Sequence, residues 1–283
     1  MKDRREMTGE LEHVQKALRE LGKSVKGLSS NPPPNKVHKL RTSARRLEAI
    51  TGALPHRKKS RQLVKTIEPL RKAAGGVRDM DVLAANIRKL RQTVPSDSLA
   101  RLVEHLESSR TAEAGELHRK LDRKRKALRH NLKQYAEGIE EAWPGFDSET
   151  SANGHSRNGH HKNAGDSAVK HLARQLGEFP ALTRDNIHEF RLKVKELRYI
   201  LQLTDPTSEF VVKLGQVQRS IGDWHDWEQL SEIAHEFLEA ERDHVLLARI
   251  DEITQQKLDR ALATANALRR QHLPRTLSRI LGC

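Results

Sequence analysis

One helical sequence pattern occurs twice in this chain of 283 residues, and it is the strongest constraint on the fold. The segment VHKLRTSARRLEAI at 37–50 aligns with IHEFRLKVKELRYI at 187–200. In both segments, apolar residues recur at the spacing of one buried face of an α-helix. A chain with such a repeat is expected to consist of two related helical halves.

Polar residues are matched in the same two segments. The first segment has His38, Arg41 and Arg45 where the second has His188, Arg191 and Lys195. These spacings place a histidine and two cations on one helix face, where the like charges repel each other by a few tenths of a kcal/mol, roughly, per pair. A bound anion would compensate for this repulsion. The structural alternatives are a solvated charged face, or histidines that are buried and hydrogen-bonded. The repetition disfavours both.

A second repeat supports a duplication. LRKAAGGVRDMDVL at 70–83 aligns with VQRSIGDWHDWEQL at 217–230, which matches Gly75 with Gly222. Glycine pairs end helices and aspartates begin them, so we expect a helix to stop at Gly75-Gly76 and another to start near Asp79.

The rest of the chain also has helical periodicity and no alternating strand pattern, which predicts an all-α fold. Asn35 is the expected N-cap of the helix that carries the first motif. The expected helices cover about 8–28, 37–50, 57–74, 79–94 and 97–140, then 167–178, 185–202, 208–221, 223–241 and 244–270.

A segment without apolar periodicity separates the halves. Residues 145–167 are rich in Ser, Asn, Gly and His, which is typical of a disordered linker, and we interpret their histidines as spacer rather than metal ligands. The predicted domains are therefore 1–144 and 168–283, on either side of this linker.

Positive charge is concentrated in the first half. Lys and Arg exceed Asp and Glu by 14 in the whole chain, and by 15 (33 against 18) in residues 1–144. This imbalance indicates a polyanionic partner. The sole cysteine is Cys283, so we expect no disulfide and no thiolate metal site. No apolar run approaches the roughly 20 residues of a membrane span, so we expect a cytoplasmic protein without a membrane partner.

The repeated motif resembles the CHAD family, named for a conserved histidine α-helical domain. The resemblance rests on His38, Arg41, Arg45, Arg46, Arg78, Asp79, Asp81 and Val82, and in the second copy on His188, Arg191, Lys195 and Arg198. The second copy departs from the first at Glu196 and His225, which align with Arg46 and Arg78. The resemblance covers most of 8–144 and 167–283.

This resemblance implies two homologous antiparallel four-helix bundles, related by a pseudo-twofold axis and packed around a basic central groove. It implies binding of inorganic polyphosphate, and association with polyphosphate granules. It implies no catalytic residue, no cofactor and no metal.

Further cations are candidates for contact with the anion, because guanidinium and ammonium groups suit phosphate oxygens. They lie off the apolar faces of two predicted helices, 57–74 and 97–140, although a solvated helix face explains them almost as well. These candidates are Lys58, Arg61 and Lys65 in one helix, and Arg119, Arg123, Lys126, His130 and Lys133 in the other.

Two other functions stay open at this stage. Nonspecific nucleic-acid binding fits the charge, but residues 1–134 contain no Phe, Tyr or Trp on which bases could stack. A metal-dependent phosphohydrolase would need the acidic residues Asp79, Asp81, Asp223 and Asp226, which we interpret as helix caps in the first pair. Polyphosphate binding without catalysis is the favoured interpretation.

Overall fold

The computed structural model describes the chain except for residues 1, 54–56, 95, 149–168, 205–207 and 274–283. Within the described residues the structure contains helices and no strand, which confirms the all-α prediction. The elements are α1 (Lys2–Val25), α2 (Pro34–Ala53), α3 (Arg57–Arg88), α4 (Ser96–Ser148), α6 (Ile187–Thr204), α7 (Glu209–Phe237), α8 (His244–Ala267) and the π-helical η1 (Leu268–His272). Residues 169–177 are also helical. None of the described helices is long and apolar enough to cross a membrane.

The chain forms two compact units. The first unit comprises Met1–Arg88 and Val103–Gly154, and the second comprises Lys89–Leu102 and His155–Cys283. The turn and first residues of α4 therefore group with the second unit rather than with the helices that surround them in sequence. Helix α4 continues to Ser148, into the segment predicted as a linker, and the remainder of that segment lies outside the described residues.

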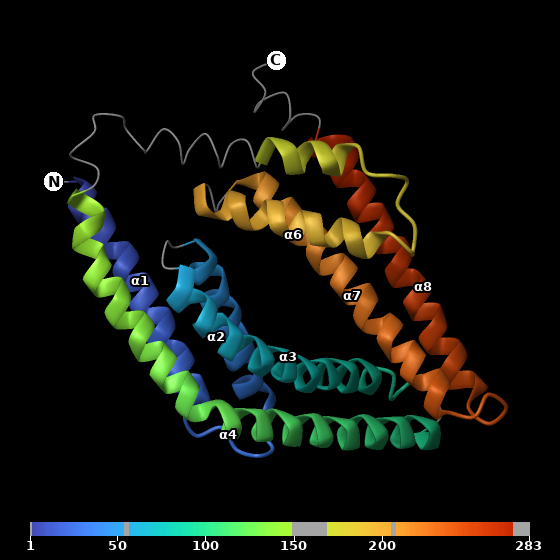
Figure 1. The fold of residues 1–283 in the computed structure, drawn as a ribbon. Coiled ribbons are helices and arrows are strands. Elements are labelled where there is room, and N and C mark those ends of the chain that lie inside the picture. The colour runs from blue at the N-terminus through green and yellow to red at the C-terminus, as the bar shows by residue number, and fades with distance from the viewer. Residues whose placement is uncertain (1, 54–56, 95, 149–168, 205–207, 274–283) are drawn as a thin grey trace. The chain divides into compact units, whose positions relative to one another are not determined.

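The core of the first unit lies between α1, α2, α3 and α4. Leu40 and Leu47 of α2 are fully buried, as their spacing predicted, together with Leu63 of α3 and Leu117 of α4. Figure 1 shows α1 and α4 of this unit running side by side. Burying each large aliphatic side chain contributes about 1.5–3 kcal/mol, which outweighs the weak helix propensity of the polar stretches.

The second unit buries the equivalent apolar stripe of α6 against α7, α8 and residues 169–177. Phe190 and Leu197 are fully buried, and Phe190 packs edge-on against Phe179 with ring centroids 5.3 Å apart. Helices α7 and α8 lie alongside each other (Figure 1). Asp243, before α8, accepts hydrogen bonds from Ser98 Oγ (2.6 Å) and the Arg101 guanidinium, which attaches residues 89–102 to this unit.

Helix α2 begins at Pro34, two residues earlier than an N-cap at Asn35 predicted. The carbonyl oxygen of Pro33 accepts hydrogen bonds from the backbone N–H groups of Lys36 (2.9 Å) and Val37 (3.3 Å). Asn35 therefore lies inside the first turn, and its prediction as N-cap is wrong. Proline suits the first helical position, because its φ is already helical and it has no N–H to leave unpaired.

The predicted break at Gly75-Gly76 is also wrong. Helix α3 runs without interruption from Arg57 to Arg88, through both glycines and Pro69. Two glycines in a helix cost about 1 kcal/mol each relative to alanine. They leave space for side chains of other helices, since a Cβ on Gly75 would lie 3.5 Å from Arg41 Nη1 and one on Gly76 would overlap the Glu113 carboxylate.

The same correction applies to the second unit. The two helices expected over 208–221 and 223–241 are one helix, α7, which passes through Gly222. A Cβ at Gly222 would lie 3.3 Å from Arg191 Nη2 of α6. In both units the motif arginine lies against a glycine of the neighbouring helix, and the approach is tighter at Gly222 than at Gly75.

Candidate functional site

The first motif lies on α2, with its histidine in solvent. His38 and Arg45 are exposed, whereas Arg41 is half-buried and turned toward α3. The alternative of a buried histidine is therefore wrong for the first copy. The structure separates the predicted stripe into an exposed part and an anchored part.

Arg41 is anchored to α3 by a half-buried ion pair. Its Nη1 lies 3.0 Å from Asp79 Oδ1 and 3.4 Å from the carbonyl oxygen of Gly75. Asp79 is in the middle of α3, so its prediction as a helix cap is wrong. This geometry fixes the guanidinium on the α2–α3 surface and leaves its other N–H groups able to donate to an anion.

Arg46 lies on the other side of α2. Its Nη1 pairs with Glu20 Oε2 of α1 at 3.0 Å, and both residues line a shallow pocket of about 210 Å³ together with His38. Because Glu20 offsets the charge of Arg46, this arginine adds less positive field than the sequence suggested.

A third arginine of the first unit, absent from the predicted set, fixes the turn before α2. Arg110 of α4 pairs through Nε with Asp81 Oδ1 at 2.7 Å, and its other nitrogens donate to Asn31 Oδ1 and the carbonyl oxygen of Pro32. The Asp81 side chain is 5% exposed, so this is a nearly buried ion pair, and the prediction of Asp81 as a cap is wrong. Nothing in the local sequence marks Arg110, because its partners are far from it along the chain.

The second motif lies on α6 and has the same general geometry. His188 is exposed, so the buried-histidine alternative is wrong here too. Arg191 Nε donates to the carbonyl oxygen of Gln218 at 3.3 Å, and Arg198 Nη1 donates to Gln218 Oε1 at 2.9 Å. Lys195 Nζ lies 5.7 Å from the ring centroid of Tyr199, a cation–π distance.

The turn before α6 is also tied to the neighbouring long helix. Arg184 Nε pairs with Glu228 Oε1 of α7 at 2.8 Å, and Asn186 closes the turn with hydrogen bonds to Thr183 N–H and the Ala181 carbonyl oxygen. Glu228 occupies the position that aligns with Asp81. The two units thus use different arginines for one task.

His188 has an electrostatic environment of its own. Its ring centroid lies 5.4 Å from that of His225 on α7. Although the side chain is largely exposed, the loss of part of its hydration lowers the pKa of His188 below its ordinary value. The neighbouring His225 and Arg191 lower this pKa further, while Glu228 raises it. The neutral imidazole is therefore favoured at neutral pH in the absence of an anion.

The basic residues predicted on α3 and α4, apart from Lys58, lie at the surface of the first unit. Five of them are exposed and make no ion pair with any described residue: Arg61, Lys65, Arg123, Lys126 and His130. Arg119 pairs with Glu116 at 2.8 Å and Lys133 with Glu137 at 3.6 Å. Arg78 is half-buried, and the side chain of Lys58 lies outside the described residues.

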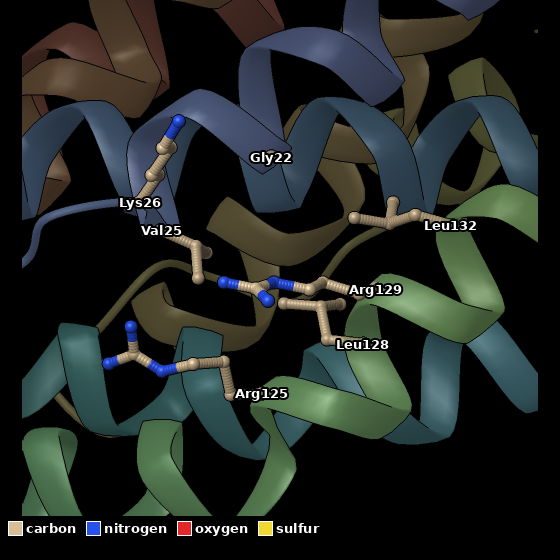
Figure 2. Close-up of a pocket in the computed structure, with 7 residues that line it drawn as sticks. All are labelled: Gly22, Val25, Lys26, Arg125, Leu128, Arg129 and Leu132. Atoms are coloured by element: carbon tan, nitrogen blue, oxygen red, sulfur yellow. The ribbon is translucent and has the colours of Figure 1, made fainter.

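A further cluster of cations was not predicted. A pocket of about 340 Å³ between α1 and α4 has an apolar floor of Val25, Leu128 and Leu132, and is bordered by Lys26, Arg125 and Arg129. Figure 2 shows the Arg129 side chain reaching toward Val25 while Lys26 points away from it. Helical spacing places Arg125 and Arg129 beside the buried Leu121–Leu128 stripe, on a different face from the predicted row. This spacing could have predicted the position of Arg125 and Arg129 from the sequence.

Three of the four acidic residues considered for a metal site, Asp79, Asp81 and Asp223, form ion pairs with a cation. Besides Asp79 and Asp81, Asp223 Oδ2 accepts a hydrogen bond from Lys257 Nζ at 2.7 Å. Among the described residues, no three His, Cys, Asp or Glu side chains gather in an arrangement suited to a metal ion.

The groove expected between His38 and His188 stays a prediction, because it concerns the arrangement of the two units relative to each other. Within each unit, the structure brings the motif histidine and its anchored arginine to one surface.

Comparison with known proteins is consistent with this architecture. A family model described as the CHAD domain matches residues 12–235. The crystal structure of the CHAD domain from the plant Ricinus communis is similar, with a TM-score of 0.55 and 18% sequence identity over 98% of this chain and 89% of that chain. At this identity the likeness shows the fold alone. The search of curated proteins gave no match.

Proposed function

The chain belongs to the CHAD family, and we propose from this and from its surface that it binds inorganic polyphosphate without transforming it chemically. Cytoplasmic polyphosphate granules are the expected place of action. The supporting observation is a surface rich in cations and poor in aromatic rings.

The first unit carries this observation most clearly. Exposed cations without an ion-pair partner among the described residues lie on both α3 and α4. Tyr135 is the sole Phe, Tyr or Trp among the described side chains of this unit, and it is fully buried. A polymer of bare phosphates needs cations and N–H donors, whereas single-stranded nucleic acid also uses exposed rings for stacking.

Preorganisation supports the same proposal. The ion pair with Asp79 holds Arg41 in place before any ligand arrives. Immobilising a long side chain on binding costs about 0.5–1.5 kcal/mol, and a guanidinium that is already held avoids much of that cost. The remaining exposed cations supply long-range attraction, which should make binding strongly dependent on salt.

One observation favours nucleic acid as a second candidate. In the second unit, Tyr199 is 46% exposed and Leu192 is 49% exposed, both on the helix of the second motif. A base stacked on Tyr199 would contribute roughly 1–3 kcal/mol. This surface suits a single strand better than a duplex, whose bases are already stacked.

A competition experiment tests the proposal. Full-length protein bound to labelled long-chain polyphosphate is challenged with unlabelled polyphosphate, single-stranded DNA and duplex DNA, at about 150 mM salt where surface charges are screened beyond roughly 8 Å. We expect polyphosphate to compete at least about tenfold better per phosphate than either DNA. If single-stranded DNA competed as well as polyphosphate or better, and no longer competed in Tyr199→Ala, nucleic-acid binding would be the better proposal.

The same experiment includes a chemical control. Incubation of the protein with polyphosphate, with and without divalent cations, is followed by measurement of released phosphate and of chain length. We expect no change in either. Chain shortening above the protein-free control would make the protein an enzyme and contradict the proposal.

A further inference from the structure

The second motif contains two facing histidines where the first motif combines a histidine with an arginine. His188 of α6 and His225 of α7 have ring centroids 5.4 Å apart, and the two ring planes are inclined by 59°. His225 aligns with Arg78 of the first motif. The first unit therefore has a permanently charged guanidinium at a position where the second has an imidazole.

The groups around the pair determine what its protonation would cost. Arg191, on the same helix as His188, and the second imidazole both oppose a positive charge there. Glu228 is the carboxylate beside the pair, 3.7 Å from His225 Nδ1, and it already pairs with Arg184 at 2.8 Å. Among the described residues, this one carboxylate serves an arginine and both imidazoles, so it offsets only part of the positive charge that protonation of both rings would add.

We propose that His188 and His225 form a proton-linked anion site, which takes up protons when polyphosphate binds and so makes the second unit bind more tightly at acidic pH. This inference rests on the proposed function and concerns how one of its sites is regulated. The incoming phosphate oxygens supply the missing counter-charge, and Arg191 donates to the same anion.

The direction of the effect follows from linkage. Desolvation, the neighbouring His225 ring and Arg191 lower the pKa of His188 in the free protein, and a bound anion raises it. Between those two values the complex holds more protons than its free components, so affinity rises as pH falls. Because the coupling is reciprocal, each proton taken up changes the affinity by at most about tenfold per pH unit within that window.

The experiment measures affinity for long-chain polyphosphate by titration calorimetry at about pH 7.5 and about pH 6, on either side of the ordinary imidazole value. Measurements in two buffers of different ionisation enthalpy report the protons taken up. We compare the wild-type chain with H188N/H225N and with H225R, which introduces the arginine of the first motif. The control variant, H171N/H244N, removes two exposed histidines of the second unit that lie outside the motif.

For the wild type and the control we expect proton uptake and about a tenfold gain in affinity on acidification. In H188N/H225N most of this gain should disappear. H225R should bind more tightly than wild type at the higher pH and depend less on pH. The circular dichroism of every variant must match the wild type, and H225R is the second test if the asparagine pair does not fold.

Two failures are distinguishable. Binding with the same pH dependence in wild type and H188N/H225N overturns the proton-linked site and leaves polyphosphate binding intact. An absence of binding at either pH in the wild type overturns the proposed function and the inference with it.

Discussion

In both motif regions an arginine of the motif helix packs against a glycine of the neighbouring long helix. In the first unit Arg41 of α2 lies against Gly75 of α3, and in the second Arg191 of α6 lies against Gly222 of α7. The guanidinium lies close to the glycine in each case, but only at Gly222 would an added Cβ be closer than an ordinary contact. The exposed histidine one turn away is presented beside an arginine whose position is fixed.

The ion pairs that hold the turn before the motif helix differ between the units. The turn before α2 is held by Arg110 on Asp81, with side chains 15% and 5% exposed, whereas the turn before α6 is held by Arg184 on Glu228, with side chains 60% and 16% exposed. The comparison teaches that the motif helix is held in place in both units, while the burial and the residue types of the groups that hold it differ. Three predictions test this difference.

The largest effect is expected from the two turn-holding arginines. Arg110→Met leaves the nearly buried Asp81 carboxylate without its cation, and Asp81 Oδ2 already lacks a hydrogen-bond partner among the described residues. Breaking a buried ion pair in this way costs about 3–5 kcal/mol. Arg184→Met removes a cation that is mostly in solvent, so we expect a loss of about 1 kcal/mol or less.

Urea denaturation measures the free energy of unfolding that each variant loses, and hydrogen exchange shows which unit has lost it. The double variant R110M/D81N is the control, because it removes the uncompensated charge and should recover part of the stability lost in R110M. Equal losses of stability from R110M and R184M would show that the deeper burial of the Arg110–Asp81 ion pair does not make it contribute more than Arg184–Glu228.

The structure confirms some of the sequence-based predictions and corrects others. The apolar stripes predicted the buried residues correctly, since Leu40, Leu47, Phe190 and Leu197 are all fully buried. Periodicity reports local burial directly, because a helix face that repeats apolar residues has one stable location. The all-α fold follows from the same signal.

The predicted break at Gly75-Gly76 failed because it used local propensity alone. The glycines serve contacts with Arg41 and Glu113, which come from two other helices and leave no mark on the sequence around them. Long-range partners also explain why Arg110 was missed. The further candidate basic residues of α3 and α4 are exposed as predicted, apart from Lys58, whose side chain lies outside the described residues. Which of them contact an anion stays a prediction.

The second prediction concerns the unequal charge of the two units. We expect neutralising four exposed cations of the first unit to weaken polyphosphate binding at least about tenfold at 150 mM salt, because each lost contact reduces the log–log salt slope by about 0.7. The variant is R61Q/K65Q/R123Q/K126Q. Glutamine is chosen because it removes the charge and keeps a good helix former.

Its matched control neutralises four exposed arginines of the second unit that lie outside both repeated segments: R91Q/R174Q/R260Q/R270Q. Both variants lose the same formal charge, so a general effect of net charge would weaken them equally. We expect the control to lose about threefold or less and to retain its salt slope. If the two variants lost the same affinity for polyphosphate, the expected difference between the units would be wrong.

The smallest effect is expected from the glycines beside the motif arginines. Alanine in a helix interior is more stable than glycine by about 1 kcal/mol. At Gly75 a Cβ would meet Arg41 Nη1 at 3.5 Å, an ordinary contact, so Gly75→Ala should stabilise the first unit by about 0.5–1 kcal/mol. At Gly222 the Cβ would lie 3.3 Å from Arg191 Nη2, so that arginine must shift, and Gly222→Ala should gain less than about 0.5 kcal/mol.

Gly115→Ala in α4 reports helix propensity alone, because nothing lies within 4 Å of its new Cβ. Hydrogen exchange in α3, α4 and α7, with urea denaturation of each variant, gives the three free-energy changes on one scale. G75A should match G115A and keep wild-type affinity for polyphosphate, since Arg41 retains its ion pair with Asp79. If G75A instead lost stability and affinity together, the contact between Arg41 and the glycine would be tighter than the structure places it. The first motif would then tolerate less change than the second, which is the reverse of the order expected here.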